Sequence, residues 1–216
     1  MDKFFNHDIP VYNFIFKLVT LILLGVIWII LSIPLFTAGA ATATLYYTTV
    51  KCIRYEEGNT FKSFFSYFIK NLKSSIIPSL LFSVLPVIII ISFVSLNKLA
   101  IISGSSGVFS FISLSPLIPI LLIFPYFFPV FSRFSLPIPI IIRNCLYFSI
   151  RYFFTTLLCW ILIVGCFIVL FMYPHFFIFT IGPCFWLISI PMEKVLVRYT
   201  KPEDNSAEKN TWYLKG

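Results

Sequence analysis

The stretch LVTLILLGVIWIILSIPLF, which occupies Leu18–Phe36, decides the fold. It holds no charged side chain and matches the length of about 20 apolar residues that a membrane-spanning helix needs. Lys3 and Lys17 precede it, and Ala38-Gly39-Ala40 follows with the small side chains of a signal-peptide cleavage site. The stretch is longer than the apolar region of a typical signal peptide, and further apolar runs follow it. We therefore expect a retained first membrane helix.

The next stretch, TAGAATATLYY over residues 37–47, is less apolar and rich in small side chains. Gly39, Ala43 and Tyr47 recur every four residues, a spacing at which small side chains let helix backbones approach closely in a bilayer. Pro34 and Gly39 are typical of a turn between two helices. We predict a short helix over Ala40–Arg54 that packs inside the bundle and is shielded from lipid.

Later runs without Asp, Glu, Lys or Arg predict four more spans. A turn at Gly104-Ser105-Ser106-Gly107 and a break at Tyr173-Pro174-His175 divide them. The predicted fold class is an all-α polytopic transmembrane bundle of five clear spans, with the short helix as a sixth. Residues 1–200 form one membrane domain, and residues 201–216 form a polar cytoplasmic tail. The four later spans are Ile76–Leu96, Val108–Phe131, Phe153–Met172 and Phe176–Met192.

The composition excludes a soluble globular domain, a disordered chain and a disulfide-stapled secreted module. Hydrophobic residues make up 59% and charged residues 11% of the 216 residues, whereas a soluble domain carries about 25% charged residues. The five cysteines include no CxxC pair, so we interpret them as small hydrophobic side chains rather than disulfides or metal ligands.

The net charge of +8 predicts a topology rather than a nucleic-acid partner. Basic residues are concentrated in Lys51–Lys73, Arg133–Arg151 and the C-terminal tail, and the connections between these segments carry little charge. Basic loops remain cytoplasmic, so the C-terminus is expected inside. If Ala40–Arg54 crosses the membrane, the N-terminus is also inside. If it does not cross, five spans leave the N-terminus outside. We favour six crossings.

Two stretches are candidates for the membrane surface. Asn59–Lys73 has the pattern of a basic amphipathic helix that lies in the cytoplasmic headgroup plane, with Asn59 or Thr60 as its cap. Phe134–Ile150 is apolar between arginines, and Pro137 and Pro139 argue against one continuous helix there. In the first stretch, Phe61, Phe64, Phe65, Phe68 and Leu72 share one face, and Lys62, Lys70 and Lys73 share the other.

No residue pattern indicates a catalytic, cofactor-binding or metal site, so an enzyme is not expected. We place none of the eight acidic residues deep in the membrane, where a proton-coupled carrier needs one. His7 and His175 both lie outside the predicted spans. The many prolines within the spans predict kinked helices whose freed carbonyls are satisfied by neighbours. The alternative is broken helices around a small polar site, as in transporters.

Several motifs occur in order along residues 1–200. The most specific is Pro34-Leu35-Phe36-Thr37-Ala38-Gly39-Ala40, running on to Ala43, Tyr46 and Tyr47. The other motifs are Glu56-Glu57-Gly58 with Phe64-Phe65 and Lys70-Asn71, Tyr126-Phe127-Phe128-Pro129 with Arg133-Phe134 and Arg143-Asn144, and Gly182-Pro183 with Arg198-Tyr199. Together these motifs resemble the YesL-like family of bacterial integral membrane proteins of unknown function. The stretch Ser135–Pro139 departs from the polar helix that similar proteins have there.

The resemblance implies a multi-pass protein of the bacterial cytoplasmic membrane, encoded near carbohydrate uptake systems. The first hypothesis is a non-enzymatic accessory or assembly partner of ABC-type carbohydrate transport that contacts permease subunits. The alternatives are a small carrier or channel in its own right, and a membrane-bound sensor or regulator. The bilayer is the expected surrounding, with no cofactor and no nucleic acid. The candidate packing and motif residues are Pro34, Thr37, Gly39, Ala43, Tyr46, Tyr47, Arg133 and Asn144, and the membrane-surface candidates are Lys62, Lys70 and Lys73.

Overall fold

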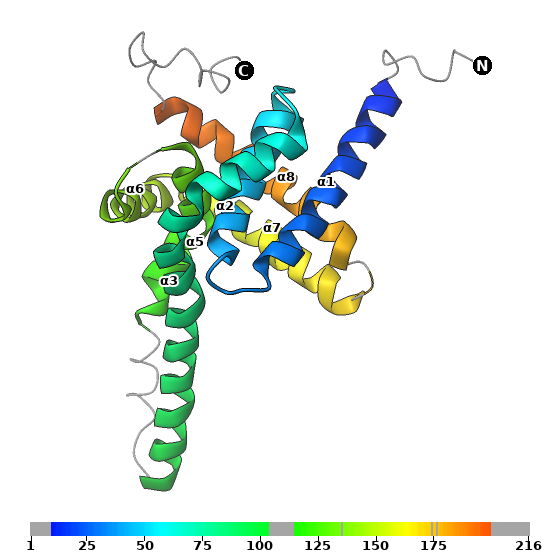
Figure 1. Cartoon of the computed structure of the whole chain (residues 1–216). Coiled ribbons are helices and arrows are strands. Elements are labelled where there is room, and N and C mark those ends of the chain that lie inside the picture. Colours follow the sequence, from blue (N-terminus) through cyan, green and yellow to red (C-terminus); the bar gives the residue numbers. More distant parts are fainter. Residues whose placement is uncertain (1–9, 104–114, 135, 174, 176, 200–216) are drawn as a thin grey trace, which may run out of the picture.

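The computed structural model describes residues 10–103, 115–134, 136–173, 175 and 177–199, and these residues form a bundle of helices without strands (Figure 1). The predicted all-α membrane bundle is confirmed. Four helical stretches are long and apolar enough to cross a membrane: Asn13–Ser32, Thr60–Lys98, Phe153–Met172 and Phe179–Tyr199. The helices are α1 (Pro10–Ser32), α2 (Ala38–Thr48), α3 (Thr60–Ser103), α5 (Leu117–Arg133), α6 (Ile138–Arg151), α7 (Phe153–Met172) and α8 (Phe177–Leu196). A π-helical segment, η2 (Thr49–Arg54), continues α2, and a 3-10 turn, η4 (Val197–Tyr199), continues α8.

The short helix α2 occupies the centre of the bundle, in contact with α1, α3, α5 and α8 (Figure 1). Eight of its 11 residues are buried. Its small side chains make this possible, because a neighbouring helix can come within hydrogen-bonding distance of its backbone. The amide of Gly39 donates to Ser79 Oγ on α3 at 2.9 Å. The predicted small-residue helix packed inside the bundle is confirmed.

Before it enters α3, the chain returns to the end of the bundle at which α1 begins. Lys17, in the first turns of α1, forms an ion pair with Glu56 in the loop after η2. Together α2 and η2 comprise 17 residues, which at the α-helical rise span about 25 Å. The connection between α1 and α2 therefore lies at the opposite end of these two helices.

The predicted surface helix at Asn59–Lys73 is not a separate element. It is the first part of α3, a helix that runs without interruption for 44 residues. This first part is inclined relative to the rest of α3 (Figure 1). The predicted cap is confirmed, since Asn59 Oδ1 accepts the amide of Lys62 at 3.3 Å. The prediction that the apolar face of Asn59–Lys73 lies in the headgroup plane is wrong for Phe64 and Phe68, because both side chains are buried against α1 and α2.

Phe64 and Phe68 are buried because the side chains of α2 are small. Ala40 and Ala41 leave room for Phe68, while Phe64 fills the space beside Leu45. The apolar side chains that α3 exposes in this part are instead Phe61, Phe65 and Ile69.

The second predicted surface stretch forms α6 after a break. Pro137 precedes the helix and Pro139 lies in its first turn, where the missing amide hydrogen disrupts no helical hydrogen bond. The predicted discontinuity at these prolines is confirmed. Ile141, Cys145 and Phe148 hold α6 against the main core of the bundle.

At one proline within a span, a neighbouring helix supplies the hydrogen bond that the proline removes, as the sequence predicts. Pro125 in α5 leaves the carbonyl of Leu121 without its helical donor, and the indole Nε1 of Trp160 in α7 donates to that carbonyl at 3.1 Å. This contact supports the interpretation of kinked helices satisfied by neighbours.

The other predicted boundaries agree in part. The helix Phe153–Met172 is confirmed, and α8 runs past the predicted end at Met192 to Leu196. In the predicted span Val108–Phe131, residues 108–114 lie outside the described residues, and α5 begins at Leu117. The predicted turn at residues 104–107 and the tail 201–216 also lie outside them.

A charged network and groove at one end of the bundle

Three helices meet at the buried carboxylate of Glu193. Its Oε2 accepts a hydrogen bond from Arg133 Nη1 at 2.9 Å, and its Oε1 accepts one from Tyr46 Oη at 2.9 Å. Arg133 ends α5, Tyr46 lies in α2 and Glu193 lies near the end of α8. The ion-paired side chains of Arg133 and Glu193 are only 4% and 2% exposed.

Local sequence explains why these side chains turn inward. Glu193 follows a long apolar run and lies in the last turns of α8, whose other buried residues hold that part of the helix in the core. Arg133 ends α5, where its charge also complements the negative end of the helix dipole. A buried charge is tolerated only when it is paired and hydrogen-bonded, so the network fixes the ends of α5 and α8 against α2.

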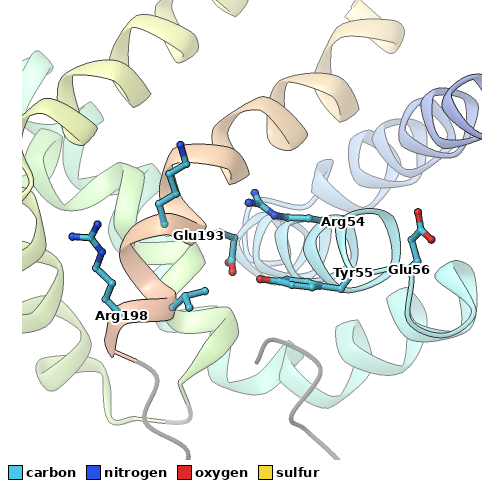
Figure 2. A pocket seen from close by; sticks show the side chains of 7 residues that line it. Arg54, Tyr55, Glu56, Glu193 and Arg198 are labelled. Carbon is cyan, nitrogen blue, oxygen red and sulfur yellow. The ribbon is translucent and has the colours of Figure 1, made fainter. Parts of the chain in front are cut away.

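A groove of about 690 Å³ opens beside this network. Figure 2 shows Arg54 and Tyr55, at the end of η2, pointing toward Glu193, whereas Glu56 points away from it. Arg54 is positioned by the backbone of α8, because its Nη1 donates to the carbonyl of Ser189 at 3.2 Å. The groove is lined by Arg54, Tyr55, Glu56, Glu193, Lys194, Val197 and Arg198.

The groove is positively charged because both of its carboxylates are neutralised by cations that do not line it. Glu193 pairs with Arg133, and Glu56 pairs with Lys17. Arg54, Lys194 and Arg198 form no ion pair with any carboxylate in the described part of the chain. Three cationic side chains therefore line the groove without a partner carboxylate among the residues that the structure describes.

The predicted motif residues are divided between this site and other parts of the bundle. Tyr46 and Arg133 meet at the network, as described above. Thr37 closes the connection between α1 and α2, since its Oγ1 lies 2.6 Å from the carbonyl oxygen of Leu31 and 2.8 Å from that of Pro34. Ala43 is fully buried in the core.

The remaining candidates lie elsewhere. Tyr47 stacks on Tyr67 of α3, with 4.1 Å between ring centroids. Asn144 is half-buried on α6 and makes no side-chain hydrogen bond within the described residues. Lys62 and Lys70 line a second cavity, whereas Lys73 is exposed and does not line it.

Sequence reasoning missed the central residue, Glu193. The available signal is its position directly after Tyr152–Met192, a run without charged residues, because an acid at the end of an apolar helix is expensive unless it has a partner. The sequence offers several basic candidates for that partner. It does not show that Arg133, 60 residues earlier, is the one.

The described residues contain no group of three or more His, Cys, Asp or Glu side chains that could hold a metal ion. The polar chemistry at this end of the bundle is that of guanidinium, ammonium and phenol groups around two carboxylates that are each paired with a cation. Such an arrangement can bind anionic groups by charge and hydrogen bonding.

Comparison with known proteins adds one match. No curated protein and no solved structure matches the chain. Residues 12–94 are similar to a family described as a protein of unknown function, DUF624. The matched region covers α1, α2, η2 and most of α3, and so includes the central helix and Arg54 of the groove. With its apolar helices, the chain is a membrane protein of unknown function that is similar over these residues to DUF624.

Proposed function

We propose that this protein is a non-enzymatic accessory or assembly partner of ABC-type carbohydrate transport, and that it docks on a permease subunit through the cationic groove. The observation that carries the proposal is the set of three groove cations without carboxylate partners, Arg54, Lys194 and Arg198. An acidic segment of a permease loop has the complementary charge.

The groove is suited to recognition because part of it is already ordered. The bond from Arg54 to the carbonyl of Ser189 holds the guanidinium group in place before a partner arrives. The network at Glu193 fixes α8 beneath the groove. Preorganised charges lose less side-chain entropy on binding and therefore favour a specific complex.

The proposed topology places this groove on the cytoplasmic side, with six crossings and both termini inside. The ion pair between Lys17 and Glu56 supports it, because the chain returns to its starting end before α3. Cysteine labelling on a background without native cysteines tests the orientation. Cysteines at Arg143 and Lys209 should react only after permeabilisation, whereas one at Ser105 should react in intact cells. The reverse pattern would overturn the topology.

The second candidate function is a small carrier, which one observation favours. A cavity of about 370 Å³ lies between the helices, lined mostly by apolar side chains. Its hydroxyl groups already have partners, since Ser79 bonds to Gly39 and Thr42 accepts from the indole of Trp28 at 3.1 Å. Such a lining suits an apolar solute better than a sugar, which needs many polar partners.

Affinity purification in mild detergent distinguishes the two candidates. Permease subunits of a carbohydrate transporter, identified by mass spectrometry, should co-purify with the wild-type protein. A triple variant with Arg54→Gln, Lys194→Gln and Arg198→Gln should lose them. A matched triple variant with Lys73→Gln, Lys98→Gln and Arg143→Gln, three exposed cations outside the groove, should retain them.

The opposite results would contradict the proposal. Retention of the permease by the groove variant would exclude the groove as the docking site. A protein that purifies without permease subunits and moves solute into liposomes by itself would replace the accessory function with the carrier.

A further inference from the structure

A second cavity, of about 320 Å³, lies between the end of α2 with η2 and the start of α3. Three lysines from two elements line it: the half-buried Lys51 of η2, and the exposed Lys62 and Lys70 of α3. No carboxylate is among the residues that line it. The lining residues are Tyr47, Lys51, Asn59, Lys62, Ser63, Ser66, Tyr67 and Lys70.

Aromatic side chains hold part of this cavity in shape. Tyr47 and Tyr67 stack, and the hydroxyl of Tyr67 donates to the carbonyl of Ser132 at 3.0 Å. Lys51 Nζ donates to Tyr47 Oη at 3.2 Å, which holds its ammonium group beside the ring of Tyr47. The wall that carries Lys51 is thus built by packing between three helices, unlike an isolated lysine on a surface.

The same part of α3 carries apolar side chains on another face. Phe61, Phe65 and Ile69 are 41%, 47% and 73% exposed. A helix that exposes large apolar groups beside lysines suits the boundary between acyl chains and headgroups. That boundary would place the cavity among lipid phosphates, and Ser66 and Asn59, which carry hydroxyl and amide donors, also line it.

We propose that this cavity binds the phosphate of an anionic phospholipid headgroup, through Lys51, Lys62 and Lys70. Three ammonium groups around one cavity repel one another, and no carboxylate lines the cavity to offset that repulsion, so an anion between them is favourable. A phosphodiester supplies that charge and accepts hydrogen bonds from the ammonium, hydroxyl and amide donors. This inference is independent of the transporter partner proposed above.

The test uses the full-length protein, delipidated in detergent, and titrates it with phosphatidylglycerol while native mass spectrometry counts bound lipid. A triple variant with Lys51→Gln, Lys62→Gln and Lys70→Gln should bind it on the order of 100-fold more weakly, at about fivefold for each lysine. The matched control carries Lys73→Gln, Lys98→Gln and Arg143→Gln, three exposed cations of which none lines the cavity, and should bind like wild type. Lys62→Gln alone alters one exposed side chain and should weaken binding about fivefold, even if the triple variant folds poorly.

Two further ligands identify the source of the phosphate. Phosphatidylcholine should bind far more weakly than phosphatidylglycerol, and inorganic phosphate should fail to displace the bound lipid. Equal binding of the two lipids, or equal affinity of the lysine variant and wild type, would overturn the site. Displacement of the lipid by inorganic phosphate at equal concentration would overturn the assignment to a membrane lipid.

Discussion

Arg133 Nη1 lies 2.9 Å from Glu193 Oε2, and this contact joins the last residue of α5 to the end of α8. The pair is buried, and Tyr46 of the central helix binds the second carboxylate oxygen. One carboxylate therefore links three helices that the chain order separates widely. Glu193 also lines the cationic groove, so the stability of this network bears directly on the proposed function.

Removing either member of this pair should destabilise the protein strongly. Glu193→Gln or Arg133→Gln leaves a buried charge without its partner, which costs about 3–5 kcal/mol. The double variant should lose less than the sum of the two single losses, with a coupling energy of about 0.5–3 kcal/mol. Denaturant unfolding of the detergent-solubilised protein, followed by circular dichroism, measures all three. Strict additivity would show that the side chains do not interact.

Bulky side chains on the small face of α2 should lower the stability of the bundle. A Cβ atom at Gly39 would lie 2.3 Å from Ser79 Oγ, and Ala43 is fully buried, so leucine at either position forces neighbouring helices apart. Gly39→Leu and Ala43→Leu should each reduce the thermal unfolding temperature and the accumulation in the membrane.

The matched control for these variants is Gly165→Leu in α7, because nothing lies within 4 Å of a Cβ built there. Thr42→Leu is unsuitable as a control, since it removes the acceptor of the Trp28 indole. If Gly39→Leu and Ala43→Leu are as stable as Gly165→Leu, close packing of α2 contributes little to the fold.

Trp160→Phe should weaken the contact between α5 and α7. The substitution preserves an aromatic ring but removes the donor to the carbonyl of Leu121, which Pro125 has left without a helical partner. A loss of about 0.5–1.5 kcal/mol is expected. Trp186→Phe is the control, because its indole makes no hydrogen bond within the described residues. Equal unfolding free energies for the two variants would show that the Trp160 bond adds nothing.

Cys145 on α6 should react slowly with thiol reagents. Its side chain is fully buried, and that burial raises the pKa of its thiol well above the usual value, so little thiolate exists at pH 8. Alkylation followed by peptide mass spectrometry measures the rate. A cysteine introduced at Ile150, which is 70% exposed on the same helix, should react much faster. Comparable rates at the two positions would mean that α6 is not packed against the core.

Much of the fold follows from local sequence. Long runs without charge predict spanning helices because unpaired charges are expensive in a bilayer. The small residues from Gly39 to Thr44 predict a closely packed helix, and Pro137 and Pro174 predict breaks, because these effects act over a few residues. The sequence suggests a separate surface helix at Asn59–Lys73, whereas tertiary packing continues it into α3 and buries Phe64 and Phe68.

The candidate site depends on contacts that no local pattern contains. Tyr46 and Glu193 are 147 residues apart, and Arg133 lies 60 residues before Glu193. The sequence by itself determined that the chain is an all-α membrane bundle with a small central helix, because apolar length and side-chain size act locally. Only the tertiary structure decided which cation pairs with Glu193 and which lysines share a cavity, because the packing of distant helices sets those distances.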